Sequence, residues 1–147
     1  MPVIFVWCML KDMTLANFKE REAEIIEAFE WIEDEIDRYE LIIEMGKSLP
    51  ILPEEYKIPE FEIKGCQSKV WLVTKENQGR VFFEADSNTM ITKGIIALLL
   101  KVVNDSSKEE LKNYQFDFID AIQLRSHLTS QRSNGLTSMI QKIKSVV

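Results

Sequence analysis

The fold is decided by residues 70–103, which read VWLVTKENQGRVFFEADSNTMITKGIIALLLKVV. Within this stretch, residues 70–74 and 80–85 are rich in β-branched and aromatic side chains, which favour strands. The Glu-Asn-Gln-Gly turn between them predicts a hairpin. The Asp-Ser-Asn-Thr segment that follows offers N-cap side chains for a helix over residues 90–103. That helix carries a long apolar run with no polar face, so we expect it to be buried.

Upstream of the hairpin, apolar residues at helical spacing predict a helix from about residue 15 to 45. Because this is long for one globular helix, we expect a break or kink near Trp31–Asp34, with Gly46 as the final C-cap. Residues 47–60 contain three prolines and predict an extended connector. Residues 61–64 alternate apolar and polar side chains, as a short first strand does.

Downstream of the buried helix, the pattern predicts a short helix through Leu111 and another over residues 124–128. A last helix is expected over residues 136–143, with Ser133 or Asn134 as its N-cap. The order of helices, a three-stranded meander and further helices is typical of an α+β fold. We therefore expect a small antiparallel three-stranded sheet packed against helices on one side.

Composition excludes several functional classes. The chain has 147 residues with 18 Lys or Arg, 24 Asp or Glu and a net charge of −6, which suits one globular domain and is a poor match for binding a phosphate backbone. No apolar run reaches the roughly 20 residues of a membrane-spanning helix. The five glycines are too widely spread for a phosphate-binding loop. A single histidine and two cysteines argue against a metal site or a disulfide framework.

The chain is expected to comprise an N-terminal appendage and one domain. Residues 1–12 are mostly apolar but lack the basic start and cleavage site of a signal peptide, so they are interpreted as an appendage outside the domain, which spans residues 13–147. We expect a cytoplasmic protein whose cysteines are reduced thiols.

Cys66 is the strongest candidate for chemistry. It follows Gly65 in the loop Lys64-Gly65-Cys66-Gln67-Ser68-Lys69 between two predicted strands, whereas free cysteines usually lie buried within elements. The small Gly65 would let a second reactant approach, and ammonium groups of Lys64 and Lys69 near the sulfur would favour the nucleophilic thiolate. From these residues alone, a reactive thiol and a half-buried packing thiol are equally plausible.

Two other residues, Arg132 and His127, remain open at this point. Asn134 and Gly135 next to Arg132 fit a turn and helix cap, but Arg132 itself is either a surface charge or a fixed partner for a carboxylate such as Asp86. His127 has no neighbour in sequence that assigns it a role, and it stays unassigned.

Taken together, these segments resemble the SufE family of sulfur-acceptor proteins, which act with cysteine desulfurases. The departures include Asn88, where a second acidic residue is common, and Gln123, where a glycine is usual. Four stretches carry the resemblance in family order: Arg38-Tyr39-Glu40-Leu41-Ile42 with Gly46-Lys47-Ser48-Leu49-Pro50; Gly65-Cys66-Gln67-Ser68-Lys69-Val70-Trp71; Ala85-Asp86-Ser87-Asn88 with Ile91 and Lys93-Gly94; and Leu128-Thr129-Ser130-Gln131-Arg132-Ser133-Asn134-Gly135-Leu136 with Met139.

The resemblance implies a fold like that of IscU-type scaffolds and a specific chemistry. The Cys66 thiolate would attack the outer sulfur of a persulfide on the desulfurase and carry it as its own persulfide to an iron–sulfur scaffold. Gly65, Gln67 and Ser68 would shape and cap the loop, and Asp86 paired with Arg132 would order it or meet the desulfurase. Residues 70–72 and the buried helix would shelter the sulfur until the loop swings outward.

The resemblance also sets expectations for cofactors and partners. The chain itself would bind no cofactor and no metal, because pyridoxal phosphate belongs to the desulfurase. The expected partners are a SufS-like desulfurase and a SufBCD-like scaffold complex, with a homodimer also considered and neither nucleic acid nor membrane involved.

Two alternatives stay open. The chain could be a related persulfide carrier for another desulfurase or sulfur pathway. It could instead be a non-catalytic adaptor that binds a basic partner through its acidic helices, since residues 1–60 hold 15 Asp or Glu and only 6 Lys or Arg.

Overall fold

The computed structural model describes residues 18–147, so the predicted appendage at residues 1–12 lies outside the described residues. The first helix includes residues 18–30. The other elements, in chain order, are α2 (Glu35–Gly46), the 3₁₀ turns η1 (Glu54–Tyr56) and η2 (Pro59–Phe61), β1 (Val70–Asn77), β2 (Arg80–Ser87), α3 (Met90–Val103), β3 (Ser106–Ser107), α4 (Lys108–Asn113), α5 (Phe118–Ala121), η3 (Arg125–His127) and α6 (Ser130–Lys144).

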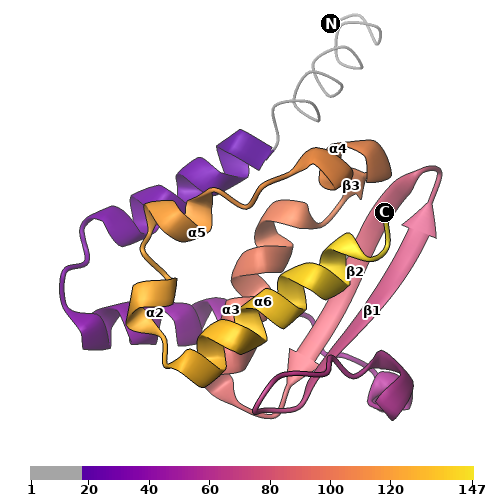
Figure 1. Cartoon of the computed structure of the whole chain (residues 1–147), viewed down its shortest axis with the longest axis horizontal. Helices are drawn as coiled ribbons and strands as arrows, with labels where there is room; N and C mark the ends of the chain where they lie inside the picture. The colour runs from indigo at the N-terminus through magenta and orange to yellow at the C-terminus, as the bar shows by residue number, and fades with distance from the viewer. Residues whose placement is uncertain (1–17) are drawn as a thin grey trace, which may run out of the picture.

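The sheet has three antiparallel strands in the order β1-β2-β3, which confirms the α+β fold (Figure 1). The β1–β2 hairpin closes at Gln78 and Gly79, whose φ angles of 53° and 79° match a two-residue turn that needs positive φ at both positions. Val70 pairs with Ser87 at the open end of this hairpin. In β2, Val81, Phe83 and Ala85 are buried and the residues between them are less so, as expected for a sheet covered on one face.

The third strand is not the one predicted. Residues 61–64 make only an isolated bridge between Glu62 and Trp71, because the chain turns away after one pair. The strand that completes the sheet is β3, a two-residue segment that pairs with the start of β2.

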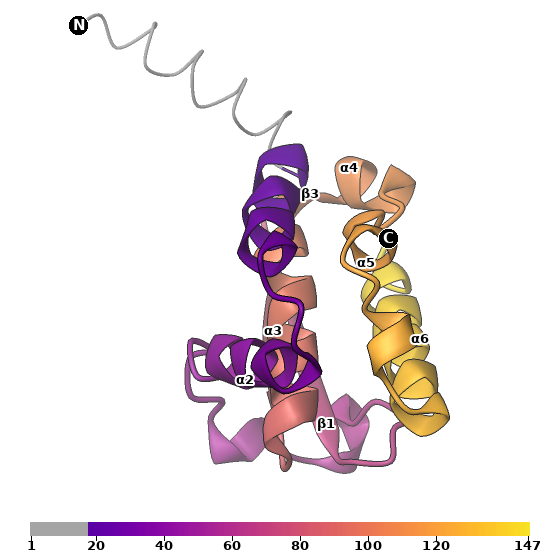
Figure 2. The same cartoon turned by 90° about the vertical axis from the view of Figure 1, so that its left-hand side faces the viewer.

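Helix α3 forms the centre of the core, as its apolar sequence predicts. It lies between α2 and α6 (Figure 2) and is buried along almost its whole length. Its contact with α2 is close because Gly94 faces the backbone of Ile42, where an added Cβ would lie 2.1 Å from the carbonyl oxygen. Gly46 packs against Gly94 in the same crossing and is the last residue of α2, so its interpretation as a C-cap was wrong; Lys47 is the C-cap.

The predicted break in the first helical region is confirmed. The chain turns over residues 31–34, and Asp34 then caps α2 by accepting hydrogen bonds from the amides of Ile36 and Asp37. Arg38 fixes the corner by donating to the carbonyl oxygens of Ile32 and Ile122.

Helix α6 begins earlier than predicted. Thr129 is its N-cap and accepts a hydrogen bond from the amide of Arg132 at 3.2 Å. The residues expected to form a cap, Ser133 and Asn134, therefore lie inside the helix, and Gly135 becomes a helical residue that faces the core.

Candidate functional site

The loop of residues 64–69 lies against α6, and this contact positions Cys66. Gly65 has a φ of +89°, and a Cβ there would lie 2.5 Å from Oγ of Ser138, so the turn requires glycine. The turn directs the half-buried Cys66 side chain towards α6, where its thiol donates to the carbonyl oxygen of Gly135 over 3.7 Å. A Cβ on Gly135 would lie 3.5 Å from the sulfur, so the absence of a side chain leaves space beside Cys66.

That space is a small recess. It offers about 10 Å³ to the centre of a water-sized sphere, which is close to the minimum for a single water molecule. Its walls come from the Cys66 loop, the start of α3 and the first half of α6. The lining residues are Cys66, Gln67, Ser68, Thr92, Ile95, Gln131, Arg132, Gly135 and Met139. Helix α3 walls the recess, as predicted, but residues 70–72 are not among its lining residues, and α6 forms the other wall.

The environment of Cys66 favours the protonated thiol. Burial raises the pKa of the Cys66 thiol, because the thiolate would lose its hydration. Lys64 and Lys69 are both exposed, and neither offsets this effect. The expectation that these lysines favour the thiolate was therefore wrong for the loop as it rests here.

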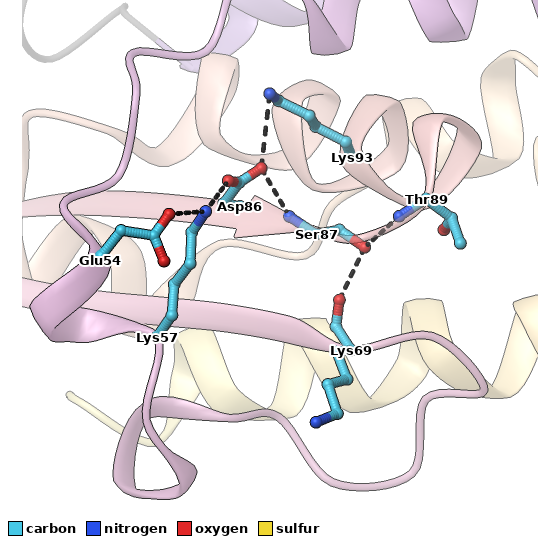
Figure 3. Close-up of polar contacts among 7 residues, drawn as sticks. All are labelled: Glu54, Lys57, Lys69, Asp86, Ser87, Thr89 and Lys93. Atoms are coloured by element: carbon cyan, nitrogen blue, oxygen red, sulfur yellow. Dashed lines mark hydrogen bonds and ion pairs between the residues drawn. The ribbon is translucent and has the colours of Figure 1, made fainter.

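The end of the loop nearest β1 is held by a network of polar contacts. The carbonyl oxygen of Lys69 accepts a hydrogen bond from Oγ of Ser87 at 2.8 Å (Figure 3). It also accepts one from the amide of Asn88 at 3.2 Å. The amide of Lys69 in turn donates to Oδ1 of Asn88 at 3.0 Å. Oγ of Ser68 accepts from the hydroxyl groups of Thr89 and Thr92 at 2.9 and 3.3 Å. The loop is thus pinned at residues 68 and 69, while the glycine turn is at its other end.

Asp86 lies next to this network but pairs with different residues from those predicted. Its carboxylate forms ion pairs with Nζ of Lys57 at 3.1 Å and Nζ of Lys93 at 3.4 Å, and it accepts a hydrogen bond from the amide of Ser87 at 2.8 Å (Figure 3). Burial alone would raise the pKa of Asp86, but the hydrogen bonds from Ser87 and Lys57 and the charge of Lys93 outweigh it and lower that pKa. The predicted Asp86–Arg132 pair was wrong, because the ion pairs of Asp86 are with Lys57 and Lys93, whereas Arg132 lines the recess.

The predicted site residues therefore form two groups. Cys66, Gln67, Ser68 and Arg132 meet at the recess, whereas Asp86 ties the connector before β1 to α3. The carbonyl oxygen of His127 accepts a hydrogen bond from the hydroxyl of Tyr39, and its amide donates to the carbonyl oxygen of Leu124 at 3.1 Å.

Sequence reasoning missed the far walls of the recess. Thr92, Ile95 and Met139 complete it and were expected only as helix or core residues. Gly135 was interpreted as a turn residue. The available signal was a small residue within a helix-forming stretch, a pattern that often marks a close approach.

Comparison with known proteins identifies the family. The family model described as the SufE Fe-S metabolism associated domain matches residues 23–147. The chain belongs to the SufE family.

Two relatives support the assignment of this SufE-family chain. An uncharacterised SufE-like protein of Rhizobium etli is 39% identical over 126 residues, covering 82% of this chain and 85% of that protein. A second, from Rhizobium meliloti, is 38% identical over 127 residues, covering 83% of this chain and 91% of the relative. A solution structure of a hypothetical protein from Thermus thermophilus has the same fold, with a TM-score of 0.69, 17% identity and coverage of 85% of this chain and 91% of that one.

The chain thus carries a SufE domain associated with iron–sulfur metabolism. Within residues 18–147 there is no cluster of three or more His, Cys, Asp or Glu side chains placed to hold a metal ion. Among the same residues, no helix is both long and apolar enough to span a membrane.

Proposed function

We propose that this SufE-family protein is a sulfur carrier: Cys66 accepts persulfide sulfur from a cysteine desulfurase and passes it to an iron–sulfur assembly scaffold. The observation that carries the proposal is the placement of Cys66. Its thiol points from a glycine turn into a recess with room for about one more atom. A thiol that served only packing would not need an adjoining space of this kind, because protein interiors are otherwise close-packed.

The transfer step follows from thiol exchange chemistry. The Cys66 thiolate attacks the outer sulfur of the donor persulfide, a new S–S bond forms at Cys66, and the donor's S–S bond breaks. The donor cysteine leaves as a thiolate and takes up a proton. Delivery is the same exchange in reverse, with a scaffold thiolate attacking the outer sulfur on Cys66. Pyridoxal phosphate is needed only by the desulfurase, which cuts sulfur from free cysteine.

In the resting geometry, the reactivity of the Cys66 thiol depends on docking of the desulfurase. Because burial raises the pKa of Cys66, few resting molecules hold the reactive thiolate. Movement of the loop away from Gly135 would hydrate the sulfur and return its pKa towards the ordinary value. Desulfurase docking is therefore proposed to draw the loop outward about its pinned end at Ser68 and Lys69. Closure after loading would place the new sulfur in the recess, away from the thiol reductants of the cytoplasm, where we place the protein.

Sulfur labelling tests this function. The protein is incubated with a desulfurase of its own cell and with cysteine that carries radioactive sulfur, and protein-bound label is measured on a non-reducing gel. We expect label on the unaltered protein and none on the Cys66→Ser variant, with faster desulfurase turnover only in the first case. Equal labelling of both proteins would refute the proposal. Repeating the assay with each desulfurase of the cell distinguishes this pathway from another sulfur pathway.

One observation favours a second candidate, an adaptor that acts without sulfur chemistry. Trp31 and Ile36 are 82% and 67% exposed at the corner between the first helix and α2, next to acidic residues such as Glu30 and Glu35. Large exposed apolar side chains often mark a protein contact. In that case Cys66→Ala would keep full stimulation of the desulfurase, whereas charge reversal along residues 27–44 would abolish it.

A further inference from the structure

The recess beside Cys66 has a buried, apolar inner end and an exposed, polar outer end. Ile95 and Met139 are each only 1% exposed and line the inner end, together with the buried Gly135. Gln67 and Gln131 also line the recess, but both are exposed. A sulfur chain that grows from Cys66 would therefore start among apolar side chains and leave the recess among polar, hydrated ones.

The size of the recess limits how much of that chain it covers. About 10 Å³ of space for the centre of a water-sized sphere corresponds to roughly one small molecule or atom. We propose that the closed loop shelters one sulfur atom beyond that of Cys66 and leaves any further sulfur exposed, so that the recess fixes the cargo at one sulfur per carrier. This inference rests on the proposed function and adds the form of sulfur that the site holds.

The chemical consequence is that longer chains are trimmed. In a Cys66 trisulfide, the thiolate of a reductant attacks the terminal sulfur at the mouth, and a bond forms between the reductant and that sulfur. The terminal S–S bond breaks, the Cys66 persulfide leaves as an anion that takes up a proton, and the reductant departs as its own persulfide. The remaining sulfur lies in the inner recess, so the next attack must wait for the loop to open.

Gly135 sets the limit on the α6 side. An alanine Cβ there would lie 3.5 Å from the sulfur of Cys66, which is ordinary contact distance, so the thiol form still fits. The same Cβ takes up space that the added sulfur would need. Gly135→Ala is therefore expected to fold with its thiol in place but to lose the ability to close over a persulfide. Met139→Ala has the opposite effect, because it enlarges the inner end of the recess.

In the test, the full chain is loaded with inorganic polysulfide. The chain carries Cys8→Ser, so that Cys66 is its only cysteine. Dithiothreitol is then added, and intact mass spectrometry follows species that carry one or two added sulfurs, about 32 Da each. We expect the two-sulfur species to decay at least roughly tenfold faster than the one-sulfur species, because only the latter needs loop opening. In Gly135→Ala the one-sulfur species should decay as fast as the two-sulfur species, and in Met139→Ala both should be protected.

The matched control is Ile143→Ala, which truncates another fully buried residue of α6 outside the recess and should behave like the parent protein. Equal decay of the two species in the parent protein, or an Ile143→Ala result like that of Met139→Ala, would overturn the inference. Because polysulfide loading needs no desulfurase, failure here is separate from failure of the proposed transfer.

Discussion

The crossing of α2 and α3 leads to a prediction whose size follows from the backbone. At Gly94 an added Cβ would lie 2.1 Å from the carbonyl oxygen of Ile42 and 2.6 Å from its carbonyl carbon. Carbon–oxygen contacts are normally no shorter than about 3.3 Å, so in Gly94→Ala the two helices must separate by about 1.2 Å. The atoms in contact belong to the backbone of α2, so no side-chain rotation can relieve the clash.

The free-energy change combines two opposing effects. Overpacking of this kind costs about 3 kcal/mol, the upper end of the usual range, because the backbone must move. Alanine in a helix interior recovers about 1 kcal/mol relative to glycine. We therefore expect Gly94→Ala to lower the free energy of unfolding by about 2 kcal/mol or more.

Urea unfolding followed by circular dichroism measures this change as a lower midpoint with an unchanged slope. Gly135→Ala is the matched control, because it is the same substitution in a helix where the new Cβ meets only ordinary contacts, the nearest 3.5 Å away. It should be neutral or up to about 1 kcal/mol more stable. A Gly94→Ala protein as stable as the parent would refute the packing argument.

Three further predictions concern other parts of the molecule. Asp86→Asn removes a carboxylate paired with Lys57 and Lys93, so the free energy of unfolding at pH 7 should fall by about 1 kcal/mol. Because folding lowers the pKa of Asp86, the parent's advantage should disappear as the pH falls below about 4, and an unchanged difference at pH 3 would contradict this. Gln123→Gly should raise the urea midpoint by the equivalent of about 1 kcal/mol, because Gln123 has a φ of +55°; a lower midpoint would argue against strain there. Iodoacetamide should modify Cys66 at pH 8 at least roughly tenfold more slowly in the native than in the urea-unfolded protein, and equal rates would show that the thiol is not sheltered.

The sequence predicts those parts of the fold whose local pattern is strong. Helix α3 has the predicted bounds, because its apolar run directly follows a polar segment, although Thr89 at the N-cap position makes no side-chain hydrogen bond to the helix. The third strand could not be predicted, because Ser106–Ser107 is too short to show periodicity and pairs only through the tertiary structure. The start of α6 was missed because residues 130–134 carry no apolar side chain that would mark a buried face.

The candidate site likewise combines features that neighbouring residues in the sequence reveal with contacts that only the folded chain creates. Cys66 is recognisable from its glycine-containing loop and its neighbours in sequence. Its hydrogen bond to Gly135 joins residues 69 positions apart, so nothing local reveals it. The partners of Asp86 were mistaken for a similar reason, because several lysines could reach that carboxylate and only the folded chain selects Lys57 and Lys93.

The central claim is that Cys66 itself receives the sulfur, and peptide mass spectrometry tests it most directly. After turnover with a desulfurase and cysteine, the protein is alkylated and digested without reductant, and the peptides that contain Cys66 and Cys8 are compared. We expect an added mass of about 32 Da on the Cys66 peptide and none on the Cys8 peptide. Sulfur on Cys8 alone, or an unmodified Cys66 beside an active desulfurase, would contradict it.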